Sequence, residues 1–232
     1  MKAEYELIKK FNEIRKKGWI EKKSKYNNSE FGLNFEKMIG KNIDYESCPD
    51  FKDIEIKTKL IFSKSSLTLF SISIDEENGI KRLIEQYGYK KNNCHSFRGD
   101  LFYGWNKVGL NKFYLEVEDN KLVLKSKSMH PIISWDIKKI EERLYTKTKK
   151  IALVYIETKK EKEKIYYRYY WMEQYILKDK VNISEMIKNK IIYITMNAGE
   201  YIDKNNQKKI LNHGNGFRIS TENLNVIYNK MY

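Results

Sequence analysis

The stretch PDFKDIEIK, residues Pro49–Lys57, decides both the fold and the chemistry that this 232-residue sequence predicts. Ile54 and Ile56 alternate with charged residues, which is the pattern of a strand with one buried face. Side chains two residues apart on a strand share a face. We therefore expect Glu55 and Lys57 to point together, away from the core on which the isoleucines pack.

The acidic residues of this stretch predict a magnesium site. Mg²⁺ prefers oxygen ligands and usually takes one or two carboxylates from a protein. Pro49 favours an extended or turned entry that can bring Asp50 beside Glu55. Lys57 would then orient an attacking water and offset charge on the phosphorane. Asp53 shares the face of Glu55, so spacing alone leaves both Asp50 and Asp53 open as the second metal ligand.

A bare Glu-x-Lys triplet carries little information in this chain. It also occurs at 21–23 and at 157–159, where an exposed, solvated face explains it equally well. Only the copy at 55–57 has an Asp five residues before the Glu, a preceding Pro and an alternating strand. A charged, exposed strand edge remains the alternative interpretation of that copy.

Charge and composition favour a globular protein with a polyanionic partner. Lys and Arg exceed Asp and Glu by 45 to 31, which gives a net charge of +14. Such an excess favours nucleic acid, because neutralising phosphates releases condensed counterions. The alternative is a lysine-rich composition that reflects codon bias.

Targeting signals and cysteine sites are not evident in the sequence. Cys48 and Cys94 have no metal-like spacing, so neither a disulfide framework nor a zinc site is expected. The first residues are polar and amphipathic, and no apolar run approaches the ~20 residues that span a bilayer. We expect a cytoplasmic protein with no membrane partner.

Hydrophobic periodicity predicts an α/β protein. Helices are expected at 3–17, 33–39, 79–87, 135–145, 183–189 and 222–230. Strands are expected at 54–57, 67–74, 113–117, 122–124, 151–156, 165–171 and 191–196, with a charged loop at 159–164. The tyrosines at 166–170 are expected to pack in an alternating strand rather than to stack on bases.

The segment 49–58 closely resembles the active-site strand of the MvaI/BcnI type II restriction endonucleases, which are MutH-like members of the PD-(D/E)XK nucleases. The resemblance continues, in order, over most of the chain and is closest to the MvaI branch. It includes GW at 18–19, GLNFE at 32–36, LTLF at 67–70, YYRY at 166–169 and HGNGFRI at 213–219.

This resemblance implies a single nuclease unit over 1–232 with a MutH-like PD-(D/E)XK core, in which helices flank a mixed β-sheet. It implies a catalytic lobe of about residues 1–90 and 150–172. A recognition lobe would hold about 91–149 and 173–232, and the two lobes would form a DNA-binding cleft.

The resemblance also implies a function and a set of catalytic residues. Glu36, Asp50, Glu55 and Lys57 would be catalytic, with Asp50 and Glu55 as ligands of Mg²⁺. The protein would be a type II restriction endonuclease that hydrolyses double-stranded DNA at a short pseudopalindromic site. It would act as a monomer that cuts the strands sequentially, alongside a cognate DNA methyltransferase.

DNA-reading residues are less firmly implied than catalytic ones. Asn212, His213 and Arg218 are the candidates, since Arg suits guanine and Asn suits adenine. The sequence departs from the family's pattern at Tyr193, Thr195 and Leu211, so the chemistry transfers better than the sequence specificity.

Two other functions stay open on the sequence. A MutH-like strand-nicking repair endonuclease would share the metal site. A non-enzymatic basic DNA-binding module would need neither metal nor Glu55.

Overall fold

The computed structural model describes residues 2–24, 27–41 and 48–231. The chain divides into two compact units, each assembled from separate segments. Unit 1 comprises residues 1–65, 145–179 and 227–232, and unit 2 comprises 66–144 and 180–226. Among the described residues, no helix is long and apolar enough to cross a membrane.

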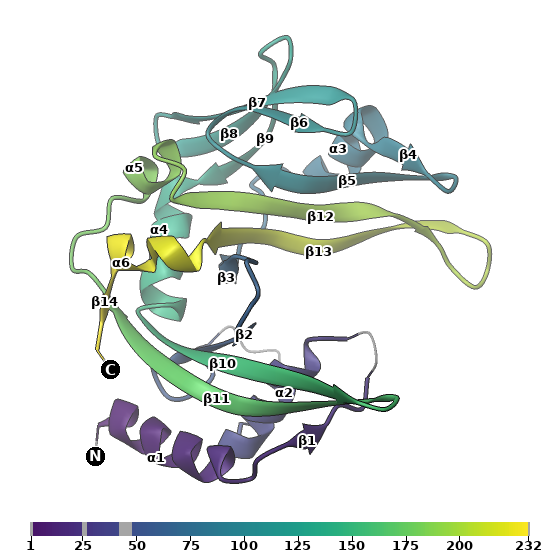
Figure 1. The fold of residues 1–232 in the computed structure, drawn as a ribbon. Helices are drawn as coiled ribbons and strands as arrows, with labels where there is room; N and C mark the ends of the chain where they lie inside the picture. The colour runs from purple at the N-terminus through teal and green to yellow at the C-terminus, as the bar shows by residue number, and fades with distance from the viewer. Residues whose placement is uncertain (1, 25–26, 42–47, 232) are drawn as a thin grey trace. The chain divides into compact units, whose positions relative to one another are not determined.

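Unit 1 is built on a mixed sheet (Figure 1). Its strands run in the order β1 (Ile20–Glu21), β11 (Lys164–Leu177), β10 (Lys150–Glu161) and β2 (Glu55–Leu60), and β14 (Tyr228–Lys230) also pairs with β11. β10 and β11 form a long antiparallel hairpin, whereas β2 runs parallel to β10. The predicted mixed sheet is therefore confirmed.

Two amphipathic helices cover one face of this sheet. α1 (Ala3–Arg15) contributes Leu7 and Phe11 to the core, and α2 (Glu30–Ile39) contributes Phe35. Buried residues from alternate positions of β10 and β11 complete the same cluster, as expected for one face of a strand. Gly40 ends α2 in the left-handed conformation, with φ of 93°.

Tyrosines fasten α2 to β11. Tyr167 and Tyr169 are almost wholly buried, and their rings lie 4.9 and 5.1 Å from those of Phe31 and Phe35. Tyr169 donates a hydrogen bond to the Phe31 carbonyl at 2.9 Å. These two tyrosines are packing residues, as the alternation predicts, and they fix the helix that carries Glu36.

Unit 2 contains two further sheets. One has the order β3 (Leu67–Ser71), β13 (Lys208–Ile219), β12 (Ile192–Ile202), β5 (Cys94–Leu101) and β4 (Tyr89–Lys91). The other has the order β6 (Gly104–Val108), β7 (Asn111–Glu118), β8 (Lys121–Ser126) and β9 (Pro131–Asp136). The remaining helices are α3 (Gly79–Tyr87), α4 (Ile137–Lys147), α5 (Ile183–Lys188), the 3₁₀ turn η1 (Thr221–Asn223) and α6 (Leu224–Ile227).

Two expected secondary-structure elements differ from the structure. The helix predicted over 222–230 stops at Ile227, because the last residues pair with β11 as an edge strand. The predicted loop at 159–164 is mostly strand, since the hairpin continues to a tight turn at Lys162 with φ of 55°. Residues 66–90, which the resemblance assigned to the catalytic lobe, lie in unit 2, where β3 pairs with β13.

A partly buried carboxylate joins the edge strand β14 to the hairpin. Glu173 accepts hydrogen bonds from the hydroxyls of Tyr175 at 2.7 Å and Tyr155 at 3.0 Å, and it pairs with Lys230 of β14. Burial raises the pKa of Glu173, but Lys230 and the two hydroxyls outweigh it and hold the pKa below its usual value. The charged form therefore stabilises the fold above the unfolded-state pKa, and this contribution is lost as the pH falls through the folded-state pKa.

We predict that Glu173→Gln lowers the free energy of unfolding at neutral pH by on the order of 1–2 kcal/mol. The deficit should shrink in acid, where the native carboxylate is protonated as well. Urea unfolding at neutral and at acidic pH measures both values. The matched control is Glu161→Gln, which removes an exposed ion pair with Lys159 and should change little. Equal losses in the two variants at neutral pH would contradict the assignment.

Candidate active site

A tight turn brings Asp50 to the start of β2, the strand at one edge of the sheet. The backbone N–H groups of Phe51 and Ile54 each donate to the other's carbonyl, at 2.9 and 2.8 Å. Lys52 occupies the turn with φ of 54°. The turn folds the chain back, so that the N–H of Ile56 donates to Asp50 Oδ2 at 2.9 Å. The four residues between Asp50 and Glu55 are thereby closed into a compact loop.

Glu55 and Lys57 meet at the beginning of β2. Lys57 Nζ lies 2.8 Å from Glu55 Oε1, as the alternation of the strand indicates. Ile54 and Ile56 are buried in the core of unit 1. Glu55 itself is only 4% exposed, opposite Ile151 of β10 in the parallel register. The exposed strand edge considered for this motif is therefore wrong for Glu55.

The structure separates the two aspartates that spacing leaves open. The Asp53 side chain is 58% exposed and lies 2.6 Å from Lys150 Nζ, which also contacts Glu4 at 2.6 Å. The Asp50 side chain is 9% exposed and bonds to the backbone of β2. Asp53 thus belongs to a surface ion-pair network, while Asp50 lies in the buried site.

Two further lysines enter the site from outside the motif. Lys41 Nζ, just after α2, lies 2.5 Å from Asp50 Oδ1. Lys147 Nζ, at the end of α4, lies 3.0 Å from Glu55 Oε2 and donates to the Cys48 carbonyl at 2.8 Å. Sequence reasoning missed both, because a lysine after or at the end of a helix is a common capping feature and signals nothing about a site.

These charges act on the acidic residues in opposite directions. Burial raises the pKa of Asp50, but Lys41, the Ile56 N–H and the charge of Lys147 outweigh it and keep the pKa below its usual value. Burial, together with the negative charges of Asp50 and Glu55, raises the pKa of Glu36. Glu36 therefore belongs to the same electrostatic cluster, although its own element is α2.

The donor set suits a hard divalent cation held by few protein ligands. Within the described residues, no group of three or more His, Cys, Asp or Glu is arranged to hold a metal. Asp50 and Glu55 are two carboxylates, the number that Mg²⁺ commonly takes. Glu55 Oε2 is buried without a hydrogen bond, although Lys147 Nζ is 3.0 Å away. The contact is therefore an ion pair without hydrogen-bond geometry, and Glu55 Oε2 remains suited to bind a cation.

The other two Glu-x-Lys triplets are engaged in surface contacts. Glu21 pairs with Lys164 at 2.9 Å, and Glu157 pairs with Arg168 at 2.6 Å. Arg168 also lies over the ring of Trp19, 4.7 Å from its centroid. Glu21 links β1 to the hairpin and Glu157 pairs across the hairpin itself, and both pairs are at least partly exposed, which agrees with the interpretation of both triplets as solvated faces.

The candidate DNA-reading residues lie on β13 in unit 2. Asn212 Oδ1 accepts from the Gly214 N–H at 3.0 Å, where φ of Gly214 is 90° and the pairing with β12 shifts register. Arg218 Nη2 donates to the Ser66 carbonyl at 2.5 Å, and its Nε is buried without a partner among the described residues. The side chain of His213 lies outside the described part of the structure.

The three positions that depart from the family's pattern lie on the same sheet as Arg218, Tyr193 and Thr195 on β12 and Leu211 on β13. Tyr193 is the direct partner of Arg218 in β12 and stacks on Phe102 with 4.5 Å between ring centroids. Thr195 donates to Asp100 at 2.5 Å. Residues directly opposite one another share a face. Tyr193 and Arg218 therefore lie on one face, and Thr195, two residues along from Tyr193, lies there too.

Comparison with known proteins gives a family and a fold. The model of the MvaI/BcnI restriction endonuclease family matches residues 8–228. The solved complex of restriction endonuclease MvaI with its cognate DNA substrate is 26% identical, with a TM-score of 0.83 over 100% of this chain and 99% of that one. MvaI without DNA is 25% identical, with a TM-score of 0.59 over 100% and 97%. No curated protein sequence matches.

The contacts of Lys147 with Glu55 and Cys48 can be tested by substitution. Lys147→Met removes a cation from the buried Glu55 and a donor from Cys48, so it should lower the free energy of unfolding by about 1–3 kcal/mol without divalent metal. Chemical denaturation in EDTA measures the loss. The matched control is Lys149→Met, which removes an exposed lysine two residues away. The role of Lys147 is refuted if both variants are equally stable.

Proposed function

The chain belongs to the MvaI/BcnI restriction endonuclease family, and we propose that it cuts double-stranded DNA with Mg²⁺ at the site of Asp50, Glu55 and Lys57. It is a type II site-specific deoxyribonuclease by this membership. The observation that carries the site is the meeting of a buried Glu55, Asp50 and three lysines at the start of β2. Double-stranded DNA as substrate is supported by the similarity to a complex of MvaI with its cognate DNA.

Asp50 and Glu55 are the proposed metal ligands. Their carboxylates supply the hard oxygen atoms that Mg²⁺ prefers, and the lowered pKa of Asp50 keeps it ionised at neutral pH. When bound, the metal supplies a Lewis acid that polarises the phosphodiester and lowers the pKa of a water. Glu36 adds negative charge to the same cluster and is proposed to support the site from α2.

The lysines are proposed to divide two tasks. Lys57 contacts Glu55 and points with it from β2, which suits a group that orients the attacking water and offsets charge on the phosphorane. Lys41 and Lys147 neutralise Asp50 and Glu55 from outside the strand. They hold the two carboxylates in place before substrate and metal arrive.

Arg218 is the strongest of the proposed base-reading residues. Its Nη2 donates to the Ser66 carbonyl and its Nε is buried, and among the described residues Nη1 has no acceptor, so Nη1 remains for a guanine edge. Asn212 already uses its oxygen to shape the bulge at Gly214, which leaves its amide group for DNA. His213 stays in the proposal through its place beside them on β13.

The remaining features of the proposal follow from family membership. We propose a monomer that binds a short pseudopalindromic site and cuts the strands in separate events. A cognate DNA methyltransferase would protect the host's own sites. Both proteins would act in the cytoplasm.

We predict that Asp50→Ala and Lys57→Ala each reduce DNA cleavage by at least on the order of 10²–10³-fold, while DNA binding stays measurable. Cleavage of supercoiled plasmid in Mg²⁺ and a gel shift in EDTA give the two readouts. The matched control is Asp53→Ala, which removes an exposed aspartate three residues away and should leave cleavage near the native rate. Full activity in Asp50→Ala, or loss in Asp53→Ala alone, would reject the site.

The plasmid products also test the order of strand cuts. A monomer that cuts the strands separately should give transient open circles followed by discrete linear bands. Open circles that persist would indicate a strand-nicking enzyme. Unchanged plasmid with a gel shift would indicate a protein that only binds DNA.

A further inference from the structure

The outer face of the four-stranded sheet β6–β9 combines aromatic and basic side chains. Trp105 of β6 is the direct partner of Tyr114 of β7, and Lys107 is the direct partner of Lys112. Direct partners share a face of an antiparallel pair, and so do residues two apart on one strand. Trp105, Tyr114 and the two lysines therefore lie on one face. The opposite face buries Phe113 and Leu115 in the core.

At the basic end of this face, the positive charges of Lys107, Lys112 and Lys127 are not neutralised by carboxylates of the described chain. By contrast, Lys125 of β8 is neutralised by Glu116 at 2.5 Å and by Glu118. Lys107 and Lys112, and Lys127 just beyond β8, are exposed, and no carboxylate of the described chain lies within ion-pair distance of them. Like charges directly opposite on a sheet are destabilising. An anion bound beside Lys107 and Lys112 would relieve that repulsion.

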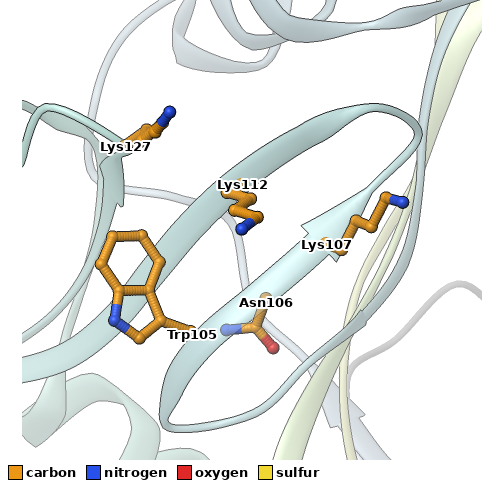
Figure 2. A pocket seen from close by; sticks show the side chains of 5 residues that line it. All are labelled: Trp105, Asn106, Lys107, Lys112 and Lys127. Carbon is orange, nitrogen blue, oxygen red and sulfur yellow. The ribbon is translucent and has the colours of Figure 1, made fainter.

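These side chains line a pocket of about 440 Å³. Its walls are Trp105, Asn106, Lys107, Lys112 and Lys127, and Figure 2 shows the indole and the lysine side chains arranged around it. A second hollow of about 390 Å³ shares Lys112 and Lys127 and continues to Leu110. Volumes of this size are in the range of small-ligand sites. The two hollows give a groove with a basic wall in common.

The indole of Trp105 is exposed yet held in place. It is 58% exposed, and its ring lies 5.1 Å from that of Tyr114 in an edge-on arrangement. The neighbouring Asn106 fixes the turn before it, donating to the carbonyls of Phe102 and Gly104 at 2.7 and 2.8 Å and accepting from the Phe102 N–H at 2.8 Å. A large aromatic surface is thus presented to solvent on a rigid strand.

We propose that this face is a binding site for single-stranded DNA, in which an unpaired base stacks on Trp105 and the flanking phosphates lie against Lys107, Lys112 and Lys127. Stacking on an aromatic ring and contacts between lysine and phosphate are the two interactions by which proteins bind single strands. All residues of the site belong to unit 2, whereas Asp50, Glu55 and Lys57 belong to unit 1. The site needs no metal, so it is separate from the cleavage chemistry.

The test measures, by fluorescence anisotropy, the binding of a labelled oligo-dT to the full chain in EDTA. Trp105→Ala should weaken binding by at least about fivefold and leave the salt dependence unchanged. The double variant Lys107→Ala/Lys112→Ala should weaken binding and make the slope of log K against log salt shallower by about 1.4. Trp105→Phe, which keeps a stacking surface, should retain most of the affinity but lose the quenching of tryptophan emission.

Two controls give the proposal a clear refutation. Lys9→Ala/Lys16→Ala removes the same charge from exposed positions of unit 1 and should weaken binding less than the Lys107/Lys112 pair. A DNA duplex of the same length should bind Trp105→Ala as tightly as the native protein. Native affinity of Trp105→Ala for oligo-dT, or an equal loss for duplex and single strand, would overturn the proposal. Because the assay contains no metal, neither outcome depends on whether the protein cuts DNA.

Discussion

Two carboxylates with little exposure to solvent, those of Asp50 and Glu55, are the constraint on which the charged residues at the start of β2 depend. Asp50 is 9% exposed and Glu55 is 5% exposed as side chains, so water screens their repulsion poorly. Three ammonium groups offset this repulsion: Lys57 from β2, and Lys41 and Lys147 from segments outside the motif. The lowered pKa of Asp50 and the raised pKa of Glu36 mark where this compensation is complete and where it is not.

Lys41 and Lys147 are positioned by the packing of the helices that precede or contain them. α2 is held on β11 through Phe31, Phe35 and the buried tyrosines, and Lys41 follows directly after the glycine that ends this helix. α4 ends at Lys147, beside the start of β10, which pairs with β2. The site therefore depends on apolar contacts some distance along the chain from the acidic motif. The same core also explains why Glu55 is buried, which neither other Glu-x-Lys triplet achieves.

In unit 2 the residues proposed to contact DNA lie on the faces of two sheets. One face of the β12–β13 pair carries Arg218 beside an aromatic stack, and the outer face of β6–β9 carries Trp105 among lysines with no carboxylate partner in the described chain. The basic side chains behind the net charge of +14 are thus distributed unevenly: some are neutralised in ion pairs, such as Lys125 and Lys164, and others lie together on defined faces. Such faces are where polyanions find both charge and stacking surface.

By itself, the sequence determined the mixed α/β class, the alternating strand with Glu55 and Lys57 on one face, and the family. These follow from local periodicity and from motifs whose residues are near one another in the chain. Only the tertiary structure separated Asp50 from Asp53, added Lys41 and Lys147, and moved residues 66–90 into unit 2. The physical reason is that burial and ion pairing depend on which distant segments pack together, and side-chain spacing along one strand does not record that.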